Sequence, residues 1–146
     1  MAERSAAVMW AGDTASQAMG MTLDEVRPGY ARMSMRVRDD MVNGHSICHG
    51  GLVFALADSA FAFACNSYNR ATVAQACDIV FVAPARLGDV MVAEAVERSR
   101  FGRNGIYDVT VTTVPVEGSA SGGALVAEFR GRSRQIAGTL AEESRP

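Results

Sequence analysis

The sequence predicts an α+β domain in which an antiparallel sheet curls around one long, buried helix. One segment near the middle of the chain is apolar nearly all round, as expected of a central helix. Strand-like segments follow it as a group instead of alternating with helices, which favours an antiparallel sheet over a parallel α/β fold. The 146 residues, 49% of them hydrophobic, suffice for one core, and we expect residues 1–146 to form a single domain.

The first two predicted elements are a short helix over about residues 4–19 and a strand that begins at Tyr30. Apolar residues recur at helical spacing through the first segment, and Gly20 is expected to end it. After Tyr30, the apolar side chains of Met33, Met35 and Val37 alternate with polar ones, which is typical of a half-buried strand.

The long apolar segment HGGLVFALADSAFAFACN runs from His49 to Asn66. It is rich in helix-forming residues and follows the turn-forming run NGHSICHGG, so the predicted helix covers about residues 50–67. Asp58 lies near its middle. An ionised carboxylate in apolar surroundings costs several kcal/mol unless it is paired, which marks Asp58 as a candidate functional residue.

Four strand candidates follow the helix, and Asn104-Gly105 between the second and third is a strong signal for a hairpin turn. The run EGSASGG is the loosest loop, and the tail over about residues 140–146 is expected to fray. We find no internal repeat. The four candidates lie within residues 71–85, 89–101, 105–117 and 123–137.

Charge and cysteine usage favour a cytoplasmic protein that binds neither nucleic acid nor membranes. The formal net charge is −2, so there is no basic field to attract polyanions. The N-terminus lacks the basic start and apolar core of a signal peptide, and no apolar run is long enough to span a bilayer. Cys48, Cys65 and Cys77 form no Cys-x-x-Cys pair, so we interpret them as reduced thiols.

The run VNGHSICHGGLVFALADSAFAFACN resembles the central motif of the hotdog-fold thioesterases, in particular the PaaI type. The later runs IYDV, at Ile106–Val109, and FRGRSRQIAGT, at Phe129–Thr139, are also similar to that family. The resemblance covers most of the chain from Tyr30 to Thr139, whereas the first 20 residues and the tail contribute little.

The resemblance implies a curved sheet around the helix, and a homodimer joined edge to edge that usually pairs again into a homotetramer. It implies hydrolysis of acyl-CoA thioesters without metal or organic cofactor. Asp58 matches the catalytic carboxylate, and Gly50 matches the glycine whose N–H polarises the thioester carbonyl. Asn43 and His49 match polar residues near the reacting group. Phenylacetyl-CoA, its ring-hydroxylated forms and medium-chain acyl-CoAs are all possible substrates.

The residues themselves support part of this chemistry. Gly50 and Gly51 lie at a helix N-terminus, where free N–H groups and the positive dipole end can stabilise an oxyanion, although such glycines also simply make turns. Asp58 is eight residues beyond Gly50, about 12 Å along the helix axis. The two cannot act on one carbonyl within a single chain. The catalytic interpretation therefore requires a dimer in which antiparallel helices bring Asp58 near the partner's Gly50.

Each candidate residue has a structural alternative. Asp58 is a general base or a nucleophile with a burial-raised pKa, or a structural carboxylate bonded to a loop or to Ser59. His49 either orients the substrate or holds the loop before the helix. Asn43 either donates its amide to the reacting group or forms a turn before Gly44. Ser59 either bonds the attacking water or the carboxylate, or bonds its own helix backbone.

The phosphates of CoA require basic residues, although any single arginine can equally belong to a solvated strand face. A metal site is not expected, because His45, Cys48 and His49 have no further ligand cluster beside them. A hotdog dehydratase and a non-catalytic acyl-CoA-binding module are the alternative functions. The candidate substrate-binding arginines are Arg100, Arg103, Arg132 and Arg134.

Overall fold

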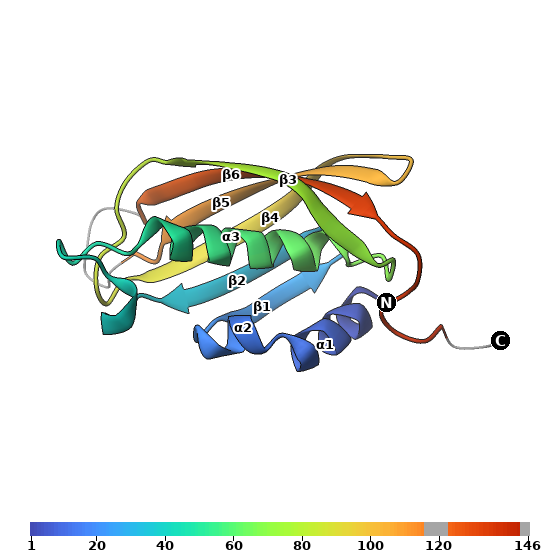
Figure 1. Ribbon diagram of the computed structural model, residues 1–146, viewed down its shortest axis with the longest axis horizontal. Coiled ribbons are helices and arrows are strands. Elements are labelled where there is room, and N and C mark those ends of the chain that lie inside the picture. Colours follow the sequence, from blue (N-terminus) through green and yellow to red (C-terminus); the bar gives the residue numbers. More distant parts are fainter. Residues whose placement is uncertain (116–122, 144–146) are drawn as a thin grey trace.

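The computed structural model describes residues 1–115 and 123–143, in which a six-stranded antiparallel sheet is crossed by one long helix (Figure 1). The strand order is β1-β2-β4-β5-β6-β3, so β1 and β3 are the two edges. The strands are β1 (Thr22–Arg27), β2 (Tyr30–Arg36), β3 (Thr72–Phe81), β4 (Val90–Phe101), β5 (Asn104–Thr113) and β6 (Leu125–Gln135). The helices are α1 (Ala2–Gly12), α2 (Thr14–Ala18), α3 (Gly50–Cys65) and a 3-10 turn, η1 (Asp39–Met41).

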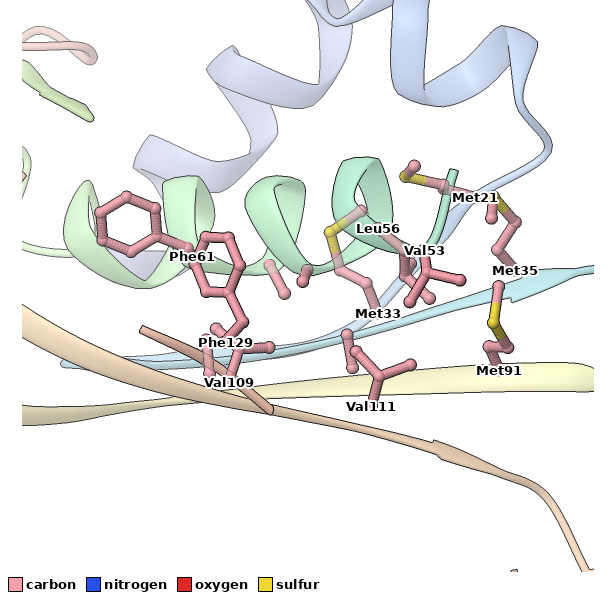
Figure 2. Close-up of a cluster of buried hydrophobic side chains, with 14 of the residues drawn as sticks. Met21, Met33, Met35, Val53, Leu56, Phe61, Met91, Val109, Val111 and Phe129 are labelled. Carbon is pink, nitrogen blue, oxygen red and sulfur yellow. The ribbon is translucent and has the colours of Figure 1, made fainter. Parts of the chain in front are cut away.

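The core lies between α3 and the inner face of the sheet. Figure 2 shows the methionine side chains of β2 and β4 between the strands and the helix, and Met33 and Met91 are fully buried. On the helix, Leu56, Ala57 and Ala60 are completely inaccessible. The predicted long helix and the antiparallel sheet around it are therefore confirmed, although α3 ends at Cys65 instead of residue 67.

Gly131 in β6 is required for this packing. A Cβ atom at Gly131 would lie 2.7 Å from the ring of Phe61 on α3. The Phe61 ring cannot move away easily, because it is buried and packs against the rings of Tyr107 and Phe129, with centroids 5.6 and 5.9 Å away. The missing side chain at Gly131 thus sets how closely α3 approaches the sheet.

The N-terminal region differs from the prediction in two ways. The predicted single helix over residues 4–19 is wrong, because the chain forms two helices that are separated at Asp13. The Asp13 carboxylate accepts a hydrogen bond from the Ser16 N–H at 2.9 Å and so begins a new helix. Strand β1 was not predicted, because a bulge between Leu23 and Glu25 interrupts the alternation of its side chains.

The hairpin between β4 and β5 is confirmed, but its turn is not at Asn104-Gly105. Phe101 pairs with Asn104, so Gly102 and Arg103 form the turn, and Gly102 has the positive φ of +58° that favours glycine. Gly105 lies within β5, where a Cβ atom would be 2.7 Å from the Ser133 hydroxyl. The predicted loop EGSASGG falls mostly on residues 116–122, outside the described residues, as do the last three residues of the predicted tail.

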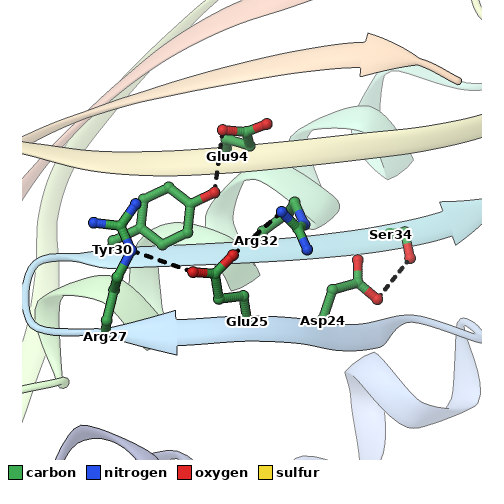
Figure 3. Close-up of polar contacts among 7 residues, drawn as sticks. All are labelled: Asp24, Glu25, Arg27, Tyr30, Arg32, Ser34 and Glu94. Atoms are coloured by element: carbon green, nitrogen blue, oxygen red, sulfur yellow. Dashed lines mark hydrogen bonds and ion pairs between the residues drawn. The ribbon is translucent and has the colours of Figure 1, made fainter.

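The two edges of the sheet differ in character. At the β1 edge, charged and hydrogen-bonding side chains of β1, β2 and β4 form a network (Figure 3). Glu25 pairs with Arg32 at 3.2 Å, and the Arg27 guanidinium lies 3.8 Å from the centre of the Tyr30 ring. The β3 edge instead exposes the large apolar side chains of Val73, Val80 and Phe81. Across the described ranges, no helix is long and apolar enough to span a membrane.

We predict that Gly131→Ala destabilises the protein. Overpacking against Phe61 should cost about 1–3 kcal/mol, more than the roughly 0.5–1 kcal/mol gained by replacing a strand glycine with alanine. Urea denaturation at one fixed protein concentration would measure the change. Gly12→Ala is the matched control, because a Cβ atom there meets nothing within 4 Å. Equal midpoints for the two variants would show that Gly131 does not limit the packing of α3.

Candidate active site

The N-terminus of α3 presents one free backbone N–H. The side chain of His49 caps the helix, and its Nδ1 accepts a hydrogen bond from the Gly51 N–H at 2.9 Å. The His49 carbonyl accepts from the N–H of Leu52 at 2.9 Å. Within the described ranges, the N–H of Gly50 donates to no acceptor. Gly50 is therefore the residue at this terminus that can offer its N–H to a substrate oxygen.

Gly50 borders a cavity of about 350 Å³ together with Asn43 and Phe81. The Asn43 Oδ1 accepts hydrogen bonds from the backbone N–H groups of His45, at 2.9 Å, and Ile47, at 3.3 Å. Asn43 therefore stabilises the turn through its side-chain oxygen. Its side-chain NH₂ group has no hydrogen-bond partner in the described part of the chain. The structure thus brings Asn43 and Gly50 to one cavity, with His49 at the helix cap beside them.

Asp58 is half-buried in the middle of α3, and its carboxylate contacts no hydrogen-bond or ion-pair partner among residues 1–115 and 123–143. Burial raises its pKa above the usual range of an aspartate, as the sequence predicted. Neither the bond to Ser59 nor a bond to a loop that a structural role would require is present there. An unpaired, partly desolvated carboxylate of this kind is typical of a catalytic base.

Asp58 lies on the side of α3 that the rest of the chain leaves partly open. Gly51, Ala55, Asp58 and Ala62 share one helix face, and all of them retain some exposure. Burial, reinforced by the negative charge of Asp58, raises the pKa of Cys65 to about 12 and that of Cys77 to about 11. Asp58 is therefore close enough to Cys65 at the end of α3 and to Cys77 in β3 to influence both thiols, and both stay protonated at neutral pH.

Ser59 does not face the same way as Asp58. Its hydroxyl lies 2.9 Å from the hydroxyl of Ser16 in α2, which donates to the Asp13 carboxylate at 2.6 Å. Because the Ser16 proton goes to Asp13, Ser59 is the donor to Ser16. In this structure the Ser59 hydroxyl ties α3 to α2, and its predicted role toward the attacking water stays a prediction.

The four candidate arginines separate into two groups. Arg100 and Arg103 line a cavity of about 290 Å³ beyond the C-terminal end of α3. Arg132 and Arg134 project from the exposed face of β6, on the side of the sheet away from α3. Sequence reasoning missed Glu97, whose carboxylate accepts hydrogen bonds from Tyr68, at 2.9 Å, and Tyr107, at 3.0 Å, beside this cavity. No local sequence signal identifies that cluster, because its members come from distant segments.

Metal ligation finds no support in the described ranges, where no group of three or more His, Cys, Asp or Glu side chains could hold an ion. His49 Nδ1 is already engaged as the acceptor from Gly51. The absence of a cofactor requirement stays a prediction.

Comparison with known proteins agrees with this geometry. The model of the thioesterase superfamily matches residues 45–119. The acyl-coenzyme A thioesterase PaaI of Escherichia coli is 38% identical over 97% of this chain and 96% of its own length. A putative esterase of Archaeoglobus fulgidus is 34% identical over 73% of this chain and 70% of its own.

Solved structures give the same result. The E. coli PaaI structure has a TM-score of 0.87, with 39% identity, and covers 94% of this chain and 95% of that one. The TT0310 protein from Thermus thermophilus has a TM-score of 0.73, with 36% identity, over 83% of this chain and 96% of that one. The predicted hotdog fold and PaaI-type resemblance are therefore confirmed, and the chain belongs to the thioesterase superfamily as a thioester hydrolase related to PaaI.

Proposed function

We propose that this protein hydrolyses acyl-CoA thioesters to the free acid and CoA, with phenylacetyl-CoA or its ring-hydroxylated forms as the first candidates. The observation that carries the proposal is the carboxylate of Asp58, unpaired within the described residues, in a chain homologous over 97% of its length to an acyl-CoA thioesterase. Similar aryl or medium-chain acyl groups remain within the proposed substrate class.

The complete active site requires a homodimer that forms through β3. An unpaired sheet edge is a template for another strand, and natural proteins protect such edges with charged side chains. The β1 edge has this protection, whereas β3 presents ten residues with exposed Val80 and Phe81. Pairing two copies along β3 covers these apolar side chains and joins the two sheets edge to edge. Further pairing of dimers into a homotetramer stays a prediction.

A two-fold axis at β3 also sets the two α3 helices antiparallel, with their partly open faces toward each other. The small side chains of Gly51, Ala55 and Ala62 on this face permit close approach. Asp58 of one protomer then lies toward the N-terminus of the partner's helix, which carries Gly50 of the partner subunit. The eight-residue separation that excludes an intrachain site is thereby bridged.

In the proposed mechanism, the partner's Gly50 N–H donates to the thioester carbonyl oxygen and stabilises the charge that develops there. Asp58 takes a proton from a water molecule, whose oxygen attacks the carbonyl carbon. The tetrahedral intermediate collapses, the C–S bond breaks, and the CoA thiolate leaves and takes up the proton that Asp58 removed from the water. Direct attack by Asp58 to form a mixed anhydride, which water then hydrolyses, is the alternative. His49 is a positioning residue, because its bond to Gly51 leaves the Gly50 N–H as the free donor.

We predict that Asp58→Asn lowers kcat by about 10²–10⁴-fold, because the amide cannot accept a proton from water. Steady-state assays with phenylacetyl-CoA, ring-hydroxylated phenylacetyl-CoA and medium-chain acyl-CoAs would measure the loss and rank the substrates. Asp40→Asn is the control, since the Asp40 side chain is exposed on the surface beside Arg38. Wild-type turnover in a folded Asp58→Asn protein would reject the mechanism, and CoA binding without hydrolysis by the wild type would indicate a binding module. Water loss from β-hydroxyacyl-CoA would indicate a dehydratase.

The same substitution should stabilise the fold at neutral pH. A raised pKa in the folded state means that ionised Asp58 opposes folding, so its stabilising contribution is complete below the unfolded pKa and is lost as pH rises through the folded pKa. We expect Asp58→Asn to have the higher denaturation midpoint at pH 7. The difference should shrink as the pH falls toward about 4, near the unfolded pKa of aspartate. A gap between the variants that is independent of pH would contradict this origin.

Sites shared between protomers predict complementation. An Asp58→Asn protomer mixed with a Gly50→Pro protomer should regain activity, because one of the two sites in each hybrid dimer then combines an intact Asp58 with an intact Gly50. Each variant alone, carried through the same unfolding and reassembly, is the control. Hybrid dimers verified by mass spectrometry that stay inactive would show that the site is not shared.

A further inference from the structure

The cavity of about 290 Å³ beyond the C-terminal end of α3 is here called the α3-end pocket. None of the residues in the proposed mechanism lines it. Its walls come from three parts of the chain. Cys65 closes it at the end of α3, Tyr68 follows in the loop, and the β4–β5 hairpin contributes Arg100 and Arg103. Tyr107 of β5 also lines it.

The α3-end pocket is positively charged. Arg70, Arg100 and Arg103 line it, and the described residues that line it include no aspartate or glutamate. Arg70 forms an ion pair with Glu143 at 3.7 Å. In the part of the chain that the structure describes, Arg100 and Arg103 contact no carboxylate. These two guanidinium groups are therefore available to an anionic ligand.

A β-bulge places Arg100 on the inner side of the sheet. The register of β4 against β5 shifts between Glu97 and Ser99, so Arg100 pairs with Gly105. Residues paired directly across two strands share a face, and Gly105 lies on the buried face together with Tyr107. Without the extra residue, Arg100 would project from the outer face of the sheet.

Arg100 is also held in position. Its guanidinium carbon lies 3.6 Å from the centre of the Tyr68 ring. The Tyr68 hydroxyl in turn donates to the Glu97 carboxylate at 2.9 Å, and Tyr107 donates to the same oxygen at 3.0 Å. A guanidinium stacked on a fixed ring keeps its N–H groups free at its edge, which suits bidentate binding of a phosphate.

We propose that the α3-end pocket binds the phosphate groups of CoA through Arg100 and Arg103, an assignment that rests on the proposed function. The negative end of the α3 dipole points into this region and opposes an anion, but it amounts to only about half a charge. The Glu97 carboxylate, which accepts hydrogen bonds from Tyr68 and Tyr107 in the pocket wall, opposes an anion as well. Arg100 and Arg103 together carry two positive charges, more than the dipole end and Glu97 combined, so the pocket still attracts an anion. Arg132 and Arg134 lie on the outer face of the sheet and are not part of this subsite.

The position of the α3-end pocket relative to Asp58 fits this assignment. Cys65 lies seven residues after Asp58, about 10 Å further along the helix axis and on the same face. The pantetheine arm, which separates the thioester sulfur from the first phosphate, is longer than this when extended. An acyl-CoA whose thioester group lies at Asp58 can therefore place its CoA phosphates in the α3-end pocket.

The test compares two substrates that share one acyl group. We expect Arg103→Ala to lower kcat/KM about tenfold for the acyl-CoA and to leave the corresponding acyl-pantetheine thioester, which has no phosphate, unchanged. Arg100→Ala should behave in the same way, and the loss should diminish at high salt. Arg36→Ala, which removes an exposed arginine from β2, is the matched control. A 3′-dephospho-CoA thioester identifies the phosphate that is bound. If the 3′-phosphate is the ligand, Arg103→Ala should no longer lower kcat/KM for this substrate.

Two outcomes would overturn the assignment. One is an equal loss for both substrates, or no loss for either, in the Arg100→Ala and Arg103→Ala variants. The other is a loss in Arg132→Ala or Arg134→Ala as large as that in Arg103→Ala. Calorimetric titration of each variant with CoA separates the subsite from the reaction. If the wild type hydrolysed no acyl-CoA but lost CoA affinity through Arg103→Ala, the subsite would stand and the proposed function would fail.

Discussion

The structure depends on the burial of a helix that is apolar on nearly every side. One sheet covers only one side of α3, and the N-terminal helices cover a second, where the rings of Trp10 and Phe63 lie 6.2 Å apart. The third side, which includes Gly51, Ala55, Asp58 and Ala62, stays partly exposed among the described residues. The apolar β3 edge, the small residues around Asp58 and its partly buried carboxylate, whose pKa burial raises, are the features that the proposed second copy would cover.

The helix terminus and the carboxylate use opposite physical effects. At Gly50, an unsatisfied N–H and the positive dipole end favour negative charge, and the His49 cap keeps this donor free by engaging Gly51. At Asp58, desolvation disfavours negative charge and so makes the carboxylate a stronger base. In the proposed dimer, a thioester between Asp58 and the partner's Gly50 would meet a donor for its oxygen on one side and a base for water on the other. Both effects come from the same helix, α3, so two copies of this chain suffice to supply them.

Most of the fold could be predicted because its signals are local. The apolar length of α3 and the alternation in β2, β4, β5 and β6 are visible in any short window of sequence. The failures came from longer-range or competing interactions. A bulge interrupts the alternation of β1, and the Asp13 cap divides the N-terminal helix. The hairpin turn forms at Gly102 and Arg103, which leaves Gly105 inside β5, paired with Ser133. The motif identified Asp58, Gly50 and Asn43 as candidates, but no sequence pattern could distinguish the position of Arg100 from that of Arg132.

Arg100 and Arg132 lie on opposite faces of the sheet because β4 contains one extra residue, in the bulge between Glu97 and Ser99. Regular alternation would put Arg100 on the outer face of the sheet, with the arginines of β6, and leave the end of α3 without this charge. This bulge shifts the alternation of the following side chains by one residue, so Arg100 points to the inner face and stacks on the Tyr68 ring. The inner side of the sheet thereby changes from apolar along α3 to cationic at its C-terminal end. An acyl-CoA has the same sequence of properties, an apolar acyl group followed by a polar arm and phosphates. Under the proposed assignment, complementarity along this axis would account for a charged pocket that adjoins a core built from methionine, alanine and phenylalanine.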